Sequence, residues 1–255
     1  MSIHSLIKTV FYKAGYSIKK IRPVARVAGA ARDHKESGTP DVMCLLHKAN
    51  PYEGFNFASL PFDAHGWGGQ SPAFRELISQ AKPRLIVEVG TWKGASALEM
   101  AGITRDLGLP TQIVCIDTWL GALEFWTDHT DVKRYLSLQL RNGYPSVYYQ
   151  FLANVCHQGF QDRIIPFPQT ASNAALWFRY YGIAADMIYL DASHEEEDVY
   201  QDLCNYWEIV ADNGLIFGDD YHDWDGVRLA VNRFAQQEGR QISFAADKWI
   251  LRKKG

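Results

Sequence analysis

The residues with the clearest chemical meaning are three aspartates, each placed just after a short apolar segment. Asp191 follows residues 187–190, and Asp219 and Asp220 follow residues 215–218. If the two segments are neighbouring parallel strands, they lie about 4.8 Å apart and their terminal carboxylates converge at one edge of the sheet. Converging carboxylates repel one another unless a cation or protons compensate, and a set of oxygen ligands favours a hard ion. We therefore predict a Mg²⁺ site here; the alternative is that one or two of these aspartates cap loops.

A histidine stands three positions beyond the first of these aspartates, in the sequence Asp191-Ala-Ser-His194. An imidazole with a pKa near 6.5 can take a proton from a hydroxyl group at neutral pH. We therefore predict that His194 is a general base. His222, in the sequence Asp220-Tyr-His-Asp223, is the competing candidate, and a structural role is the alternative for either histidine.

A glycine-containing turn follows the apolar segment 85–89. Residues 88–96 read Glu-Val-Gly-Thr-Trp-Lys-Gly-Ala-Ser. Gly90 lets the backbone turn tightly and approach a ligand, and Gly94 lets a helix pack closely on a strand. The G-x-x-x-G spacing differs from the G-x-G-x-x-G pattern that binds a dinucleotide pyrophosphate. Because Glu88 precedes the turn, a cationic ligand suits it better than a phosphate.

Asp117 lies at the end of a second apolar segment, 27 residues after Gly90. A carboxylate in this position can accept hydrogen bonds from both hydroxyls of a ribose. The alternative is that Asp117 caps the next helix. Together with the turn, it predicts a nucleoside-containing ligand.

Alternating strands and helices must position these residues. The pattern predicts an α/β protein with a doubly wound, mostly parallel sheet, helices on both faces and a C-terminal antiparallel strand. Ligands in such a sheet bind at the carboxyl ends of the strands. The sequence Asp212-Asn-Gly214 predicts a turn, and Ser71 with Pro72 predicts a helix start. Strands are expected at 85–89, 112–116, 163–167, 186–190, 215–218, 242–245 and 249–252, and helices at 72–82, 94–107, 195–210 and 226–238.

Composition divides the chain into three predicted parts. Residues 1–35 form a basic amphipathic arm with eight Lys or Arg and one acid, residues 36–70 an aromatic loop region that can serve as a substrate lid, and residues 71–255 the catalytic domain. A basic amphipathic helix can lie on an anionic membrane or pack on another subunit, so peripheral membrane contact and a homo-oligomer are both expectations. The formal net charge of −3 argues against a nucleic-acid partner.

The four cysteines are scattered and read as buried thiols in a reducing compartment. No apolar run approaches the length of about 18 residues that a membrane span needs, and the N-terminus lacks the apolar core of a signal peptide. We therefore expect a cytoplasmic protein, with the inner face of the membrane as its site of peripheral contact.

These motifs together resemble those of class I S-adenosylmethionine-dependent methyltransferases, over about residues 72–253. Within that class they are most similar to the metal-dependent sugar O-methyltransferases of the macrocin and mycinamicin type. The resemblance implies that Asp191, Asp219 and Asp220 hold Mg²⁺ and that His194 is the base. Asp220 departs from the catechol-type enzymes, which carry an amide there. The implied residues of the cofactor pocket are Glu88, Gly90, Thr91, Gly94, Ser96, Asp117, Thr118, Gln169, Ser172 and Asp191.

The reaction that follows is a Mg²⁺-assisted transfer of the methyl group from S-adenosylmethionine to a hydroxyl of a saccharide or glycosylated small molecule. The aromatic segments 55–67 and 119–126 are candidates for the wall that contacts the acceptor. The alternatives are an NAD(P)-dependent oxidoreductase, which would need the tighter glycine pattern, and a non-catalytic membrane-recruited subunit of a glycan-building complex. A serine hydrolase lacks its nucleophile elbow here.

Overall fold

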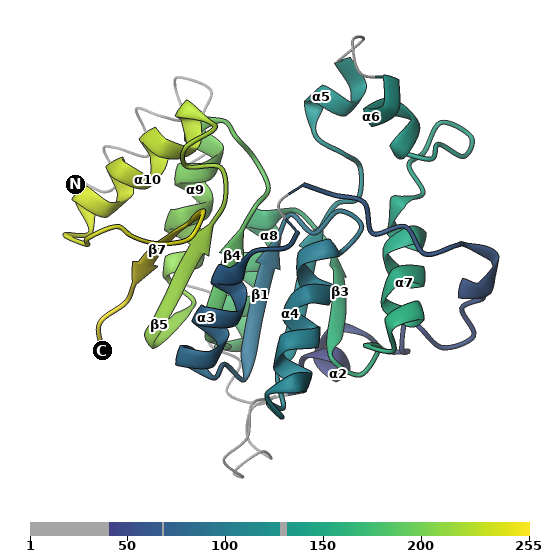
Figure 1. Cartoon of the computed structure of the whole chain (residues 1–255), viewed down its shortest axis with the longest axis horizontal. Coiled ribbons are helices and arrows are strands. Elements are labelled where there is room, and N and C mark those ends of the chain that lie inside the picture. The colour runs from purple at the N-terminus through teal and green to yellow at the C-terminus, as the bar shows by residue number, and fades with distance from the viewer. Residues whose placement is uncertain (1–40, 68, 128–131) are drawn as a thin grey trace, which may run out of the picture. The chain divides into compact units, whose positions relative to one another are not determined.

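The computed structural model describes residues 41–67, 69–127 and 132–255, so the predicted basic arm lies outside the described residues. Within them, one seven-stranded sheet has the order β3-β2-β1-β4-β5-β7-β6 (Figure 1). Strands β1 to β5 are parallel, and β7 runs antiparallel to both β5 and β6. This confirms the predicted α/β class and its C-terminal antiparallel strand. The strands are β1 Leu85–Val89, β2 Gln112–Asp117, β3 Ile164–Pro168, β4 Ala185–Leu190, β5 Val210–Gly218, β6 Ser243–Ala245 and β7 Lys248–Arg252.

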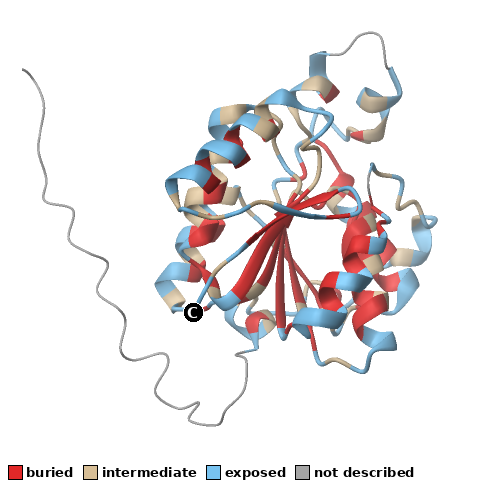
Figure 2. Ribbon diagram, turned by 60° about the vertical axis from the view of Figure 1, so that its left-hand side comes forward, coloured by how far each residue is buried: buried red, intermediate tan, exposed pale blue. Residues whose placement is uncertain are grey.

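Helices cover both faces of the sheet, as the doubly wound pattern predicts (Figure 2). One face packs against α3, α4 and α7, and the opposite face packs against α8, α9 and α10. Ser71 begins the first of these helices, because its hydroxyl oxygen accepts the N–H of Ala73 and Pro72 occupies the first turn. The helices are α3 Pro72–Ala81, α4 Ala95–Asp106, α7 Val147–Gln158, α8 Ala171–Tyr181, α9 Glu196–Trp207 and α10 Asp225–Gln237.

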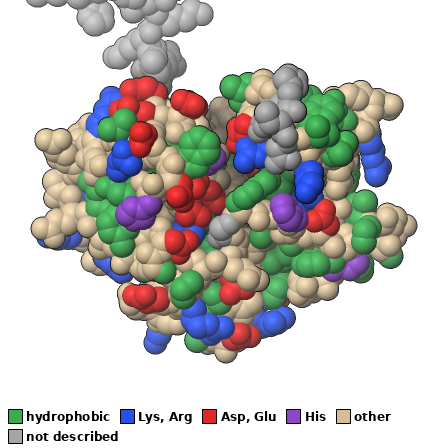
Figure 3. All heavy atoms as spheres, turned by 45° about the horizontal axis from the view of Figure 1, so that its top comes forward, with side chains coloured by type: hydrophobic (Ala, Val, Ile, Leu, Met, Phe, Trp, Pro, Cys, Tyr) green, Lys and Arg blue, Asp and Glu red, His purple; other side chains and the backbone are tan. Residues whose placement is uncertain are grey.

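The strand order reverses beside β1, since the chain runs from β1 to β2 and β3 on one side and then to β4 and β5 on the other. A crevice forms at such a reversal, outside the carboxyl ends of the strands. Two short helices, α5 (Leu123–Thr127) and α6 (Val132–Ser137), stand above this edge. Figure 3 shows the hollow between them and the rest of the molecule, with acidic side chains gathered in it.

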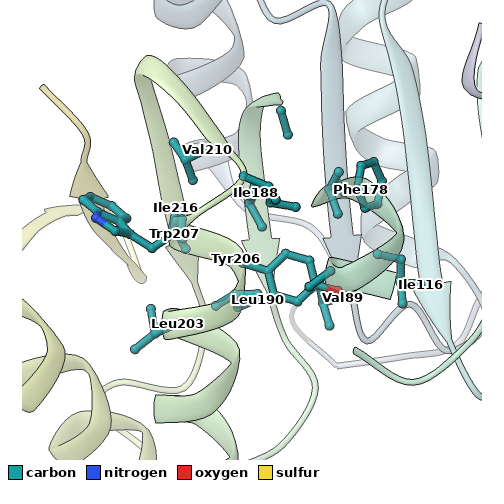
Figure 4. Close-up of a cluster of buried hydrophobic side chains, with 14 of the residues drawn as sticks. Val89, Ile116, Phe178, Ile188, Leu190, Leu203, Tyr206, Trp207, Val210 and Ile216 are labelled. Carbon is teal, nitrogen blue, oxygen red and sulfur yellow. The ribbon is translucent and has the colours of Figure 1, made fainter. Parts of the chain in front are cut away.

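Burial of apolar side chains fixes the strand ends that carry the site. Val89 and Leu190 are the last residues of β1 and β4, and Ile116 is the next-to-last residue of β2. They belong to the buried cluster shown in Figure 4, together with Phe178 of α8 and Leu203 of α9. A fully buried side chain of this size contributes about 1.5–3 kcal/mol. These contacts hold the ends of three strands level, so the residues that follow them share one edge.

Three local predictions differ from the structure. The predicted loop of residues 36–70 contains α2 (Val42–Leu46) and a 3₁₀ turn at Phe57–Ser59, both too short to produce a helical apolar period. The predicted turn at 212–214 is an irregularity inside β5, because pairing with β4 resumes beyond it. Helix α8 carries no predicted counterpart. No helix of the described residues is long and apolar enough to cross a membrane.

Candidate active site

The hollow at the carboxyl edge is a cleft of about 1380 Å³. Asp117, Asp191 and Asp219 stand at the ends of β2, β4 and β5 and all line it. The sheet thus brings together residues that lie as far as 102 positions apart in the chain. Of the residues predicted for the site, those that line the cleft are Gly90, Thr91, Ser96, Asp117, Thr118, Gln169, Ser172, Asp191, His194, Asp219 and Asp220.

The glycine-containing turn passes directly against the end of β4. Gly90 has a φ of 88°, and a Cβ placed on it would lie 1.9 Å from the carbonyl oxygen of Asp191. Only glycine fits this backbone and this approach. Gly94, also with positive φ, precedes α4, and a Cβ there would meet the Phe151 ring at 2.9 Å. Close packing therefore fixes the backbone of this turn, which forms one side of the cleft.

Glu88 and Gly94 do not line the cleft. The Glu88 side chain is fully buried beneath the turn, where its carboxylate accepts hydrogen bonds from the hydroxyls of Thr91 (2.9 Å) and Ser96. Burial raises the pKa of Glu88 to about 7, and these hydrogen bonds oppose the rise. Glu88 therefore holds the turn in shape from below.

Asp117 is held by the backbone on both sides of it. One carboxylate oxygen accepts the N–H of Trp92 and the other accepts the N–H of Trp119, each at 2.7 Å. Desolvation raises the pKa of Asp117, while these backbone donors lower it. The N–H of Gln169 donates to the Asp117 carbonyl oxygen at 3.0 Å, so the ends of β2 and β3 form one continuous wall of the cleft.

His194 is hydrogen-bonded to one of the aspartates. Its Nε2 lies 3.0 Å from Oδ2 of Asp220, and its ring stacks on Trp224 with centroids 4.2 Å apart and planes 13° apart. The hydrogen bond to Asp220 raises the pKa of His194, and burial opposes this effect. His222 also lines the cleft, but it stacks on Phe244 (5.3 Å) instead. Of the two candidate bases, His194 has the carboxylate partner.

Asp191 and Asp219 also have partners inside the protein. Asp191 accepts a hydrogen bond from the Tyr189 hydroxyl at 3.0 Å, and burial followed by the charges of Asp219 and Asp220 raises the pKa of Asp191 to about 7. Asp191, Asp219 and Asp220 all line the same cleft, at the edge where their strand positions predict them.

Lys248 is a residue of this site that the sequence did not reveal. Its side chain is fully buried, and Nζ lies 2.6 Å from Oδ2 of Asp219 and 2.5 Å from Oδ2 of Asp247. Its only sequence signal is a charge next to the apolar residues 249–251 of β7, and lysines at strand ends are more often exposed.

The predicted Mg²⁺ site does not match this arrangement. Carboxylates are suitable donors for Mg²⁺, yet Asp219 is paired with an ammonium group, Asp220 with an imidazole, and Asp191 with a phenol hydroxyl. Among the residues that the structure describes, no group of three or more His, Cys, Asp or Glu side chains is placed to hold a metal ion. The residues do not fit the ion as they stand.

An aromatic wall forms the outer side of the cleft, from parts of both predicted segments. The Phe125 ring in α5 lies 5.8 Å from the Trp67 ring and 4.6 Å from the Trp92 ring, and all three residues line the cleft. Phe55 and Phe57 point elsewhere, since their rings contact residues of α7. Only the end of segment 55–67 reaches the cleft.

Comparison with known proteins identifies the family. A family model described as a methyltransferase domain matches residues 87–221, which contain the glycine turn and all three aspartates. The chain belongs to this family. The prediction of a methyltransferase is therefore confirmed, and the oxidoreductase alternative is set aside.

Similar proteins of known structure are methyltransferases of the same fold. They include the O-methyltransferase NovP (TM-score 0.50, 18% identity, 72% of this chain and 78% of that one) and CalS11, the calicheamicin methyltransferase (0.51, 17%, 71% and 76%). TomG, an O-methyltransferase from Streptomyces achromogenes, aligns over all of both chains at 15% identity with a TM-score of 0.51. At these identities the likeness establishes the class I fold.

A curated relative is similar over a shorter stretch. The rhamnosyl O-methyltransferase of Mycobacterium tuberculosis is 35% identical over 51 residues, which is 20% of this chain and 21% of that protein. The match thus spans about a fifth of the relative's length.

Proposed function

We propose that this methyltransferase transfers the methyl group of S-adenosylmethionine to a hydroxyl oxygen of a saccharide or glycosylated small molecule. The observation that carries the proposal is the pair of His194 and Asp220 in the same cleft as the glycine turn and Asp117. A base oriented by a carboxylate is needed to remove a hydroxyl proton. A sulfur or carbon acceptor of low pKa would need no such pair.

The cofactor would bind between the glycine turn and the ends of β2 and β3. Asp117 would accept the ribose hydroxyls with its remaining lone pairs, and Gln169 and Ser172 would lie against the adenine. Ten acidic side chains and two basic ones line the cleft within the described residues. This negative field favours the cationic sulfonium of the cofactor.

His194 would act as the base through Nδ1. Its Nε2–H donates to Asp220, which fixes the tautomer and leaves the Nδ1 lone pair to accept the hydroxyl proton. As the O–CH₃ bond forms, the S–CH₃ bond breaks and its electron pair stays on sulfur, giving S-adenosylhomocysteine. Asp220 stabilises the imidazolium that results, and Trp224 holds the plane of the ring.

The acceptor would lie between His194 and the aromatic wall of Trp67, Trp92 and Phe125. Sugar rings pack their apolar faces on aromatic rings. Glu124 of α5 lines the same cleft, and its charge helps to raise the pKa of His194. The negative lining favours an uncharged acceptor over a phosphorylated one. The name of one similar protein, a rhamnosyl O-methyltransferase, agrees with a sugar acceptor.

The basic arm would add peripheral contact with an anionic membrane, because residues 1–35 carry eight cationic side chains. Replacing Lys13, Lys19 and Lys20 with Gln in the full chain should weaken sedimentation with anionic vesicles but not with neutral ones. If wild type and variant sediment equally with anionic vesicles, the arm does not bind the membrane through these lysines, and packing on the domain or on a second subunit is its remaining role.

The test of the main proposal combines binding with turnover. Calorimetric titration should detect S-adenosylmethionine binding, with NAD as the negative control. His194→Ala should abolish transfer of a labelled methyl group to a panel of glycosides while cofactor affinity stays unchanged. His222→Ala is the matched control and should retain turnover. Absence of cofactor binding, or full activity of His194→Ala, would refute the proposal.

A further inference from the structure

A buried ammonium group stands behind the carboxylate edge of the cleft. Lys248 is the first residue of β7, its side chain has no solvent exposure, and Nζ lies 5.8 Å from the centre of the Phe74 ring. A buried charge is strongly unfavourable unless close partners compensate it. Here the partners are Asp219 at 2.6 Å and Asp247 at 2.5 Å.

Both carboxylate oxygens of Asp219 are already engaged. Oδ2 pairs with Lys248, and Oδ1 accepts the N–H of Asp220 at 2.9 Å. The backbone carbonyl of Asp219 accepts the indole N–H of Trp249 at 2.9 Å. The C-terminal strand therefore fixes this aspartate from behind with a charge, a hydrogen bond and an aromatic ring.

The second partner anchors the lysine. Asp247 accepts a hydrogen bond from the Ser71 hydroxyl at 2.5 Å. Burial raises the pKa of Asp247, but the hydrogen bonds from Lys248 and Ser71 outweigh burial and lower it. Ser71 also caps α3. Ser71, at the start of α3, thus holds Asp247, and Asp247 holds the Lys248 ammonium in contact with Asp219.

We infer that Lys248 is the resident counter-cation of the edge formed by Asp191, Asp219 and Asp220, and that it takes the place of the divalent ion that such a set of carboxylates otherwise favours. The inference rests on the proposed function, since it concerns the site that would hold and activate the hydroxyl. It makes Lys248 a positioning residue: it fixes Asp219, and through the Asp219–Asp220 hydrogen bond it fixes the partner of His194.

The charge of Lys248 should control how tightly the carboxylate edge binds a cation. With Lys248 in place, Asp219 is neutralised at contact distance, and the edge presents less negative charge to a cation in the cleft. Removal of the ammonium leaves Asp191, Asp219 and Asp220 without this compensating positive charge. A divalent cation should then bind to them more tightly. A lysine with a purely structural role would not change cation affinity in this direction.

The test is a titration of the full-length protein with Mn²⁺, followed by electron paramagnetic resonance, in the presence of S-adenosylhomocysteine. Wild-type protein should bind Mn²⁺ only with a Kd of about 1 mM or weaker, in the range of weak carboxylate sites. Lys248→Gln, whose amide can still donate to either aspartate, should bind at least about tenfold more tightly. Lys253→Gln is the matched control, because the Lys253 ammonium donates to the backbone carbonyls of Trp207 and Val210.

Two results would overturn the inference. One is stoichiometric Mn²⁺ binding by the wild-type protein at micromolar concentration together with loss of methyl transfer in EDTA. The other is a folded Lys248→Gln protein whose Mn²⁺ affinity does not rise. The wild-type titration decides the question even if the variant fails to fold. Failure of S-adenosylhomocysteine to bind would refute the proposed function instead, and calorimetry measures it separately.

Discussion

Replacement of Glu88 by glutamine tests the electrostatics beneath the glycine turn. The Glu88 carboxyl is fully buried, and burial raises its pKa from 4.5 to about 7. The unfolded chain therefore releases this proton near pH 4.5, whereas the folded protein keeps it until about pH 7. Because the unfolded state binds fewer protons between these values, the free energy of unfolding falls as the pH rises through this window.

The size of the effect follows from the pKa shift. One pKa unit corresponds to about 1.4 kcal/mol, so ionised Glu88 destabilises the folded protein by about 3 kcal/mol above pH 7. Glutamine stays neutral and avoids this penalty. Its amide accepts less well than a carboxylate from the hydroxyls of Thr91 and Ser96, which costs about 1 kcal/mol. We expect Glu88→Gln to be about 2 kcal/mol more stable than wild type at pH 8 and to match it at pH 5.

Urea unfolding of both proteins at four values between pH 5 and pH 8 measures the difference. The comparison must be made between the two proteins at each pH, because burial also raises the pKa values of Asp191 and Asp202 to about 7, so both carboxyls titrate in the same window. The charge of Glu88 is the last of the causes that raise the pKa of Asp191, behind burial, Asp219 and Asp220. A stability difference that does not change with pH would refute the reasoning. It would mean that Glu88 has the same protonation in the folded and unfolded states.

Three further replacements address the cleft itself. Asp220→Asn should lower kcat about 100-fold or more, because the amide no longer fixes the tautomer of His194, and calorimetry should find cofactor affinity unchanged. Gly90→Ala should lose at least about 2 kcal/mol of stability in urea unfolding and most cofactor affinity, since the new methyl would lie 1.9 Å from the carbonyl oxygen of Asp191. Trp67→Ala should raise KM for the acceptor about tenfold and leave kcat unchanged; a loss of kcat alone would contradict its assignment to the acceptor wall.

The position of the candidate site could be predicted because it depends on strand ends. Apolar runs in the sequence locate β2, β4 and β5, and parallel strands place their last residues at one edge. Asp117, Asp191 and Asp219 follow from this rule alone. The register of β4 and β5 confirms the rule for Asp191 and Asp219, because Leu190 pairs with Gly218 and each of these residues is followed by an aspartate.

The surroundings of these aspartates could not be predicted, because they depend on contacts between distant segments. Lys248 reaches Asp219 only because β7 pairs with β5 so that Trp249 stands beside Gly218. A Cβ on Gly218 would lie 2.3 Å from the Trp249 ring, so the missing side chain permits this close packing. Nothing in the local sequence specifies an antiparallel register of this kind.

The aromatic residues illustrate the same limit. Phe57 and Trp67 lie in one aromatic segment with similar composition, yet Phe57 packs on His157 of α7 and Trp67 contacts Phe125 at the cleft. Composition predicted an aromatic wall, but only tertiary packing decides which rings belong to it. In the same way the Asp-Asn-Gly sequence at 212–214 predicts a turn locally, and pairing with β4 on both sides turns it into an irregularity of β5.

The loop after β4 links the glycine turn to the side of the cleft that carries His194. Gly90 of the glycine turn packs against the carbonyl of Asp191, and Gly226 at the start of α10 packs against the carbonyl of His194, where a Cβ would lie at 2.1 Å. The glycine turn and the start of α10 thus pack against the two ends of the four-residue loop 191–194. Alignment of the hydroxyl with the methyl group to within a fraction of an ångström is what makes displacement fast. His194, the proposed base, stands on the same loop as the Asp191 carbonyl that contacts the glycine turn, so backbone packing would set the distance between the base and a cofactor bound at the turn.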